Sequence, residues 1–415
     1  MKKTLLISLA ALLAGSAAFA QETPAKFKLY GFIRNYFIAD TREVNAGTND
    51  LYFYMPKDHK MEGGVDLNEG FNWRYLSLTT RLGLDVSGYK FGSMNLSGKV
   101  EADFYSLSGT STSAIVPQLR LRQAYVKLDW DESPLALTLG QAWHPVAVDL
   151  PHITNLESGA PFNPFSRTPQ VTADVNLGGG FSLTASLLYL NHFLPTGPNG
   201  KSVEYYKYGL PEFYVGFGYK GSKLVAKAGL DMVNMRPYRT YDNKFAKGLL
   251  TTFSPFVYLQ FTDGKFQLRA KSILAQAGEH MNLLSGYGVA SYNASSNTFT
   301  YTPMQDWASF VSFQYGKKVQ VLGMLGYFKQ LGTTADLMDV TNMFWMNTAA
   351  DARIQQAFRA TPTIAWNIGK FTVSLEYNLT AAEFGRGNRN ARGIYDGTPE
   401  WIMNHRFICM TKFTF

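Results

Sequence analysis

The chain has 415 residues, of which 46% are hydrophobic and 17% charged, and its formal net charge is +8 at pH 7. Its mean hydropathy is −0.13, and after residue 21 no stretch has the roughly 20 apolar residues that a membrane-spanning helix needs. The single cysteine, Cys409, excludes an intramolecular disulfide and a zinc site built from cysteines. A soluble β-protein and a transmembrane barrel both fit these numbers, because alternating lipid-facing and lumen-facing residues average out in a hydropathy profile.

The first twenty residues have the three parts of a secretory signal peptide. Met1-Lys2-Lys3 is cationic, the run from Leu5 to Ala14 is apolar, and Ala18-Phe19-Ala20 has the small-x-small pattern of a cleavage site. We predict that 1–20 is cleaved on export, which removes two lysines and lowers the formal charge from +8 to +6 (8 − 2). Residues 21–415 are expected to form one domain, because nothing in the composition marks a boundary.

Tight turn signals separate segments in which apolar and polar residues alternate, and such alternation is typical of strands. Before the first signal, one face is assigned Leu76, Leu78, Leu82, Leu84 and Val86, and the other Ser77, Thr79, Arg81 and Asp85. Glycine and aspartate permit the positive φ angles of hairpin turns, and seven such signals occur. They are Gly88-Tyr89-Lys90, Asp131-Glu132-Ser133-Pro134, Gly178-Gly179-Gly180, Gly221-Ser222, Asp263-Gly264, Gly316-Lys317 and Gly369-Lys370. Seven short turns, with one strand left at each end, predict sixteen strands.

Eight longer and irregular connections alternate with these turns, at about 41–72, 108–116, 145–167, 195–209, 236–247, 278–303, 332–351 and 385–399. This asymmetry is typical of outer-membrane barrels, which have short periplasmic turns and long extracellular loops. A β-sandwich would also alternate, but many segments here reach the 9–11 or so residues of a tilted spanning strand, beyond the usual 5–6 or so. The predicted fold is therefore all-β, an antiparallel up-and-down transmembrane barrel of about 16 strands.

Two regions resemble trimeric bacterial porins, nearest to the anion-taking porins for dicarboxylates and phosphate. Ile115–Leu128 with Leu137–Trp143 is similar to a strand pair of that family, and Leu29–Arg34 and Val100–Phe104 are similar to other stretches of its dicarboxylate members. The resemblance covers mainly the first 170 residues. Because Gln21–Lys26 is shorter than the helical extension of some members, that assembly element is not expected.

In such porins, the resemblance implies, the third long connection folds into the lumen and narrows it. Here that connection is Pro145–Arg167, and five prolines in and beside it disfavour its addition to the sheet: Pro145, Pro151, Pro161, Pro164 and Pro169. We expect a constriction near 145–168, with an outward surface loop as the alternative.

The alternation also assigns residues to the lumen. Arg120 and Arg122 point inward if Leu119 and Leu121 face lipid, but the segment from Ala124 onward has the opposite parity, so a bulge is predicted between them. An arginine facing lipid at mid-membrane would cost about 2–4 kcal/mol. The pore-lining or constriction candidates are Arg34, Arg81, Lys99, Arg120, Arg122, Asp149, His152, Glu157, Arg167, Arg269, Arg359 and Arg406. Lys227, Lys271 and Arg353 are also assigned inward, as are the acids Asp85, Glu101, Asp103, Asp231 and Glu376.

The last segment alternates to its end. Phe407, Phe413 and Phe415 are expected to face outward with Cys409, and Arg406 and Lys412 inward. The aromatic ending resembles the signal by which outer-membrane barrels are recognised for assembly. This segment is expected to pair with the strand that starts near Phe27 and so to close the barrel.

These observations predict an outer-membrane porin that passes small hydrophilic solutes passively, with a mild preference for anions, carboxylates among them. A basic lumen attracts anions, although pairing of the inward charges for stability is an alternative. Two other functions stay open: a plugged structural or adhesive barrel, and a barrel hydrolase, for which no catalytic motif is written. The six histidines lack metal-ligand spacing, so no enzyme activity, cofactor or metal is expected. Expected partners are membrane lipid and lipopolysaccharide, the barrel-assembly machinery and, by analogy, two further copies in a homotrimer; export argues against nucleic acid.

Overall fold

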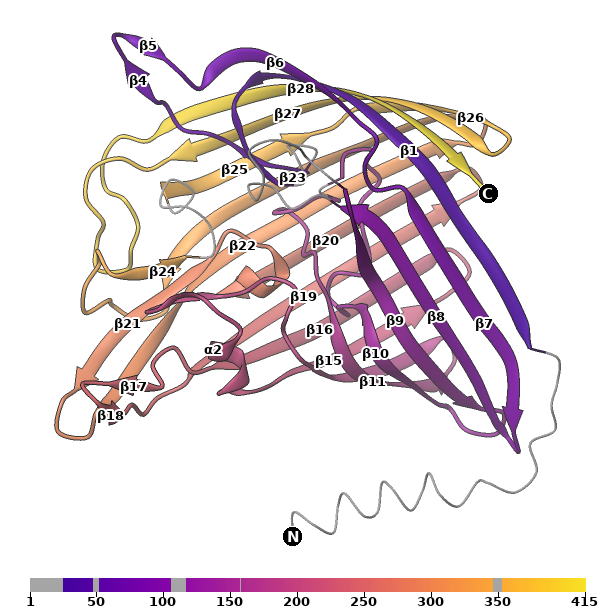
Figure 1. Ribbon diagram of the computed structural model, residues 1–415, viewed down its shortest axis with the longest axis horizontal. Helices are drawn as coiled ribbons and strands as arrows, with labels where there is room; N and C mark the ends of the chain where they lie inside the picture. The colour runs from indigo at the N-terminus through magenta and orange to yellow at the C-terminus, as the bar shows by residue number, and fades with distance from the viewer. Residues whose placement is uncertain (1–24, 48–51, 106–116, 157, 346–352) are drawn as a thin grey trace.

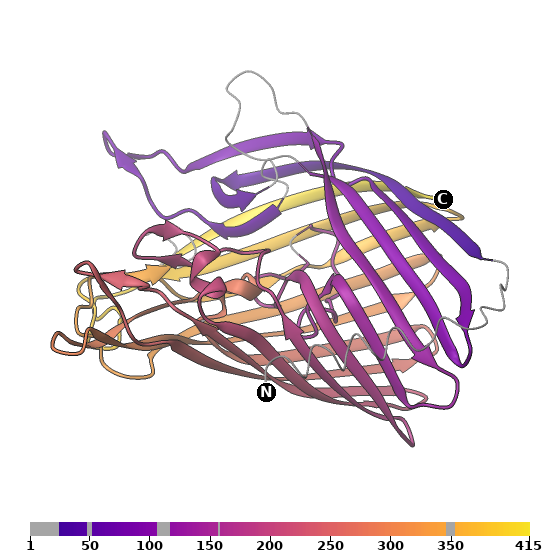
Figure 2. The ribbon, with the colours of Figure 1, turned by 60° about the horizontal axis from the view of Figure 1, so that its bottom comes forward.

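The computed structural model describes residues 25–47, 52–105, 117–156, 158–345 and 353–415, and they form a closed antiparallel barrel (Figures 1 and 2). The predicted signal peptide 1–20, the connection 108–116 and Glu157 lie outside the described residues. The barrel has sixteen strands, two of which are interrupted. In chain order they are β1 (Lys26–Arg42), β6 (Glu69–Leu76) continued by β7 (Arg81–Phe91), β8 (Met94–Tyr105), β9 (Gln118–Trp130), β10 (Leu135–Trp143), β11 (Arg167–Gly178), β12 (Phe181–Leu188), β15 (Leu210–Lys220), β16 (Leu224–Met235), β19 (Leu250–Asp263), β20 (Phe266–Gln276), β22 (Thr298–Gly316), β23 (Val319–Thr333), β25 (Ile354–Ala360) continued by β26 (Thr363–Ile368), β27 (Phe371–Phe384) and β28 (Glu400–Thr414).

The long connections carry shorter elements. These are β2 (Val44–Gly47), β3 (Tyr52–Pro56), β4 (Met61–Glu62), β5 (Val65–Asp66), β13 (Thr196–Gly197), β14 (Gly200–Lys201), α2 (Glu204–Lys207), β17 (Thr240–Tyr241), β18 (Lys244–Phe245), the 3-10 helix η1 (Gly278–Met281), β21 (Gly286–Asn293) and β24 (Met343–Trp345). In the described part of the chain, no helix is both long and apolar enough to cross a membrane.

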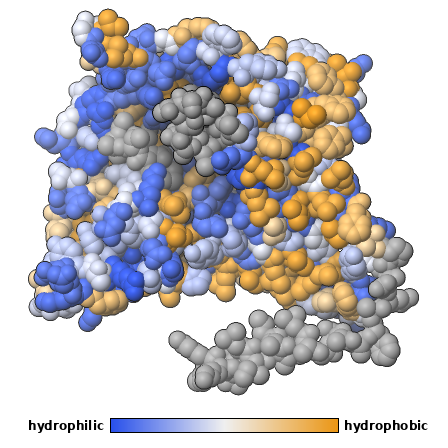
Figure 3. All heavy atoms as spheres, in the orientation of Figure 1, coloured by the Kyte–Doolittle hydropathy of each residue, from blue (hydrophilic) through white to orange (hydrophobic). Residues whose placement is uncertain are grey.

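Along the strands of the barrel wall, apolar side chains on the outside alternate with side chains that face the interior. In β19, buried and exposed residues alternate from 250 to 259, with Phe253, Val257 and Leu259 about half exposed on the outside and Ser254 and Tyr258 inside. Apolar side chains that remain exposed in such numbers indicate a surface made for a non-aqueous environment. In Figure 3 hydrophobic residues gather over the strands at the right of the view, whereas the end with the long connections, at the left, is mainly hydrophilic.

The first and last strands close the barrel. β28 pairs with β1 from Phe32 opposite Thr414 to Asp40 opposite Arg406, and it pairs with β27 on its other side. As predicted, Phe407, Phe413 and Phe415 are exposed on the outer surface, while Arg406 is fully buried on the inside. The expected sixteen-stranded, up-and-down barrel is thus confirmed, because every one of its strands has two neighbours and no edge is left open.

Two local predictions were wrong. The first hairpin turns at Gly92-Ser93 rather than at Gly88–Lys90, and Gly88 lies within β7 with a φ of 93°, where the register shifts between Val86 and Tyr89. A positive-φ glycine therefore marks a bulge here, not a turn. The second strand is also interrupted at 77–80, where Thr79 has a φ of 63°. Because of this break Leu78 is buried inside instead of facing out.

The bulge predicted in β9 is present. Glu101 of β8 lies opposite Gln123, and the next residue, Ala102, lies opposite Leu121, so Arg122 is the extra residue. Leu119 and Leu121 are exposed on the outside, and Arg122 is buried inside. The bulge therefore lets the strand change parity without turning an arginine toward the outer surface.

Candidate functional site

The connection between β10 and β11 lies against the inner wall of the barrel. We call residues 144–156 and 158–166 the inward segment. Its two ends meet where the backbone N–H of His144 donates to the carbonyl of Ser166, 3.1 Å away. Of the five prolines, Pro169 does not belong to it, because Pro169 lies in β11 opposite Gln141. Arg167 likewise begins β11.

Cationic side chains of β20 and β25 hold the backbone of the inward segment. Lys271 Nζ donates to the carbonyls of Val146 and Asp149 at 2.9 and 2.8 Å and to Oδ1 of Asn163 at 3.0 Å. Arg269 donates to the carbonyl of Leu150 at 2.7 Å, and Arg359 to that of Ala160 at 2.9 Å. These hydrogen bonds pair backbone carbonyls of the inward segment that have no partner in a sheet.

Further contacts reach the wall at β1, β22 and β27. The N–H of His152 donates to Oγ of Ser312 at 3.2 Å, and that of Thr154 donates to a carboxylate oxygen of Glu376 at 2.5 Å. The hydroxyl of Tyr36 in β1 donates to the carbonyl of Thr154 at 3.3 Å. The inward segment thus crosses the interior and contacts strands from both halves of the chain.

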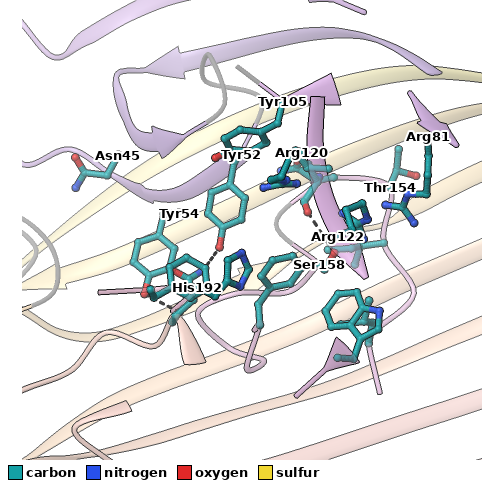
Figure 4. A pocket seen from close by; sticks show the side chains of 18 of the residues that line it. Asn45, Tyr52, Tyr54, Arg81, Tyr105, Arg120, Arg122, Thr154, Ser158 and His192 are labelled. Carbon is teal, nitrogen blue, oxygen red and sulfur yellow. Dashed lines mark hydrogen bonds between the residues drawn. The ribbon is translucent and has the colours of Figure 1, made fainter. Parts of the chain in front are cut away.

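One cavity of about 850 Å³ lies beside the inward segment (Figure 4). Four arginines and a lysine line it: Arg34, Arg81, Arg120, Arg122 and Lys201. Aromatic, apolar and uncharged polar residues form the rest of the described lining, and none of these is an aspartate or glutamate. A cavity with this lining offers positive charge to a solute.

Acids behind the cavity orient the arginines. Arg120 donates from Nε and Nη2 to both oxygens of Asp103 at 3.1 Å, and its guanidinium lies 4.0 Å from the ring centre of Tyr105. Arg122 donates to Glu101 and to Asp103, each at 2.8 Å. Such paired, planar guanidiniums keep a fixed orientation. Figure 4 shows Arg120 and Arg122 on the same strand.

Arg34 and Arg81 are held differently. Arg34 donates to the hydroxyl of Thr79 at 2.6 Å, and no ion pair of its side chain occurs among the described residues. Arg81 lies 3.7 Å from Glu101, beyond hydrogen-bond distance. The four arginines therefore share two carboxylates, so this wall carries more positive than negative charge.

The other predicted lumen residues do not line this cavity. Lys99 pairs with Asp85 at 2.7 Å, Asp149 with Lys227 at 2.8 Å, and Arg406 with Asp40 at 2.8 Å. The imidazole of His152 contacts the side-chain oxygen of Gln267 at 2.7 Å. Arg269 and Arg359 hold the inward segment, and Arg167 is buried beside the rings of Trp143 and Phe165. Pairing of inward charges, the alternative to anion attraction, thus occurs at Lys99, Asp149 and Arg406.

Several lining residues were not anticipated. Asn45, Tyr52 and Tyr54 come from the first long connection, and His192 and Lys201 come from the fourth. Burial and the charges of Arg167, Arg120 and Arg122 hold the pKa of His192 well below its usual value. Nothing in the local sequence of these connections indicates that they fold toward the lumen.

Family models give no match to this chain, and neither does any curated protein. Solved structures do match. The outer membrane channel DcaP of Acinetobacter baumannii is 19% identical, with a TM-score of 0.67 over 96% of this chain and 100% of that chain. An anion-selective porin from Comamonas acidovorans is 10% identical, with a TM-score of 0.54 over 94% and 100%. OmpF of Salmonella typhi, solved with daunomycin, is 11% identical, with a TM-score of 0.53 over 94% and 98%. The resemblance to porins is thereby confirmed for the fold: the chain has the fold of the bacterial outer-membrane porins.

Proposed function

We propose that this protein is an outer-membrane porin, a passive channel for small hydrophilic solutes with a mild preference for anions such as carboxylates. The observation that carries the proposal is the cavity of about 850 Å³, which four arginines and Lys201 line without any described carboxylate. Positive side chains around a pore lower the entry barrier for anions. The porin fold, shared over nearly the whole chain with solved channels, supports the same function.

The mechanism needs no bond to be made or broken. The inward segment narrows the lumen, and solutes too large for the remaining space are excluded. Arg120 uses Nε and Nη2 on Asp103, and its Nη1 has no hydrogen-bond partner in the described part of the chain. That group can therefore donate to a passing anion while the rest of the side chain stays fixed, so binding costs little side-chain entropy.

A plugged barrel is the second candidate, and one observation favours it. Apolar side chains of the inward segment and of β3 form a buried cluster with the wall, including Met55, Val146, Phe162, Phe310 and Phe328. Part of the interior is therefore filled with packed side chains instead of water. The two functions differ in whether the remaining cavity connects both sides of the membrane.

Single-channel recording separates these candidates. Purified protein is added to a planar lipid bilayer, with detergent buffer alone as the control. The porin proposal expects stepwise current increments. If the protein inserts into the bilayer and gives no increments, the channel proposal is contradicted and the plugged barrel is favoured.

The finer expectations about assembly join this proposal. We infer that the signal peptide is cleaved after Ala20 and that the barrel-assembly machinery recognises the outward-facing aromatic residues Phe407, Phe413 and Phe415. We also infer that the barrel contacts lipopolysaccharide and forms a homotrimer. N-terminal sequencing of outer-membrane fractions should begin at Gln21. An intact mass larger than that of residues 21–415 would contradict this cleavage site.

A further inference from the structure

Four buried side chains from four separate elements meet at the base of the inward segment. They are His144 at its start, Glu212 of β15, Asp231 of β16 and His280 of η1, and none is more than 2% exposed. One nitrogen or oxygen atom from each lies within 4.8 Å of the corresponding atoms of the other three. None of these residues lines the arginine cavity.

The charge of this cluster is not balanced by a basic side chain. Two carboxylates are buried here, and in the described part of the chain no lysine or arginine forms an ion pair with either of them. Buried carboxylates are costly unless a proton, a cation or several hydrogen bonds compensate them. The two histidines provide hydrogen bonds, but they do not satisfy all the oxygens.

Unpaired atoms point to a missing cationic partner. Oδ1 of Asp231 has no hydrogen-bond partner among the described residues, although it lies inside the cluster, 3.7 Å from Nε2 of His144. Oε2 of Glu212 and Nδ1 of His280 are likewise buried and unpartnered within the described chain. Native structures leave few buried polar atoms unsatisfied, and a bound ion can satisfy several such atoms at once.

The hydrogen bonds of the His144 and His280 rings indicate different roles for the two residues. The N–H of Val146 donates to Nδ1 of His144 at 3.2 Å, which places the proton of that ring on Nε2. From there it donates to Oε1 of Glu212 at 2.5 Å. No backbone donor holds the proton of the His280 ring: its Nδ1 has no partner among the described residues, while its Nε2 forms a 3.1 Å hydrogen bond with Oδ2 of Asp231 and lies 3.6 Å from Oε1 of Glu212. A metal ion can take the place of the Nε2 proton if that proton moves to Nδ1. His280 is therefore the ring that can present a lone pair.

We propose that Glu212, Asp231 and His280 bind one divalent transition-metal ion, and that His144 positions Glu212 by donating to it. Metal–ligand bonds of about 2.0–2.2 Å around a tetrahedral Zn²⁺ separate neighbouring ligand atoms by roughly 3.4 Å. The distances from His280 Nε2 to Oδ2 of Asp231 and Oε1 of Glu212, 3.1 and 3.6 Å, bracket that value. One of the two unpartnered oxygens, Oδ1 of Asp231 or Oε2 of Glu212, would supply the fourth ligand. Imidazole with carboxylate suits Zn²⁺ and its neighbours better than Mg²⁺ or Ca²⁺, which prefer oxygen ligands alone.

Such an ion has a structural consequence. It joins two strands of the wall and η1, and through His144 it holds the first residue of the inward segment. The metal would therefore fix the base of the segment that narrows the lumen. This role does not depend on whether the cavity conducts.

The test measures metal bound to the whole protein. Because the cluster is buried, the protein is unfolded with a chelator, refolded with Zn²⁺ or Co²⁺, passed through a desalting column and analysed by elemental mass spectrometry. We expect about one ion per chain, as at a structural zinc site. Asp231→Asn and His280→Gln should lose it, and His144→Gln should weaken binding by about 10- to 100-fold, as losses of orienting partners do. His59→Gln is the matched control, since His59 lies in the first long connection, away from the cluster, and contacts Asp66 there and Glu400 at the start of β28.

Folding of each variant is checked by circular dichroism and by the heat-dependent gel mobility of folded barrels. The visible spectrum of the Co²⁺-loaded wild type gives a readout that does not rely on variants, since nitrogen and oxygen ligands in tetrahedral geometry give intense d–d bands. A wild type that retains no ion, or folded Asp231→Asn and His280→Gln variants that retain as much as the control, would overturn the proposal. In that case protons alone compensate the two carboxylates.

Discussion

Individual cations of the cavity differ in what they contact, and this decides which of them can be tested cleanly. Removing Arg122 would take from Glu101 the guanidinium that lies within hydrogen-bond distance of it and would leave Asp103 with Arg120 alone, so lost selectivity could not be separated from damage to the fold. Arg34 contacts only the hydroxyl of Thr79 through its guanidinium among the described hydrogen bonds. Its replacement removes one positive charge from the lining and uncovers no acid.

We therefore expect Arg34→Gln to lower the anion-to-cation permeability ratio. A unit charge about 7 Å from a permeating ion in water attracts an anion and repels a cation by roughly 0.6 kcal/mol each, so its removal lowers the ratio about sevenfold at low ionic strength. Reversal potentials in a KCl gradient measure the effect. Arg392→Gln, which removes an exposed charge paired with Asp336 in an outer connection, is the control and should leave the ratio unchanged. Equal ratios for both variants would place Arg34 outside the ion path.

His152 gives the inward segment a pH dependence of stability rather than of selectivity. Burial and the nearby charge of Arg269 lower the pKa of His152 to about 4. Because this pKa lies below the unfolded value of about 6.5, the folded state is favoured at neutral pH and loses stability as pH falls from 6.5 to 4. The His152→Gln variant should therefore lose about 2–3 kcal/mol less unfolding free energy than the wild type over this pH range. Denaturant midpoints in detergent at pH 7.5, 5.5 and 4.5 measure the difference. Identical pH profiles for variant and wild type would contradict this.

Residue positions were predictable where the cause is local. The parity change after Leu121 sufficed to predict the bulge at Arg122, because alternation is a property of neighbouring residues. The meeting of His144, Glu212, Asp231 and His280 could not be predicted, since these residues lie up to 136 positions apart (280 − 144) and no spacing rule joins them. Their proximity depends on which strands become neighbours and on where the inward segment begins.

At the scale of elements, the inward segment depends on β20. Lys271 donates to three oxygens of the segment and is itself buried. The prolines and the resemblance to porins single out this connection in the sequence. The atoms that hold it were not predictable, because Lys271 follows it by more than a hundred residues and resembles any other inward lysine in sequence.

Lys271→Met should loosen the segment, because three oxygens would lose their donor while the side-chain volume is nearly kept. We expect a loss of about 2–4 kcal/mol of unfolding free energy and noisier single-channel current. Lys223→Met is the control, since Lys223 pairs with Asp263 on the exposed surface. Unchanged noise together with unchanged stability would show that these hydrogen bonds do not hold the segment.

At the scale of the molecule, closure joins the two ends of the chain. Asp40 of β1 accepts from Nε and Nη2 of Arg406 of β28, each at 2.8 Å, and from the amide of Asn404 at 2.7 Å. All three side chains are fully buried. Alternation and turn count predicted the strands that meet here. Beside them, Tyr36 and Ile38 form a buried apolar cluster, against which Leu156 of the inward segment packs.

Asp40→Asn should destabilise the closed barrel by about 3–5 kcal/mol, since the buried guanidinium of Arg406 would lose its carboxylate. Denaturant unfolding in detergent micelles measures the change. Asp131→Asn removes an exposed acid that pairs with Lys90 and should leave the midpoint where it is. Equal midpoints for the two variants would mean that this network does not stabilise the seam.

In the proposed channel, solutes cross the membrane through a cavity whose lining favours anions. The zero-current potential of the wild-type protein in a planar bilayer, under a KCl gradient of about tenfold at low ionic strength, tests it most directly. We expect a potential with the sign of chloride-preferring permeation, because four arginines and Lys201 line the cavity without a described carboxylate. A potential of the opposite sign, showing preference for potassium, would contradict it.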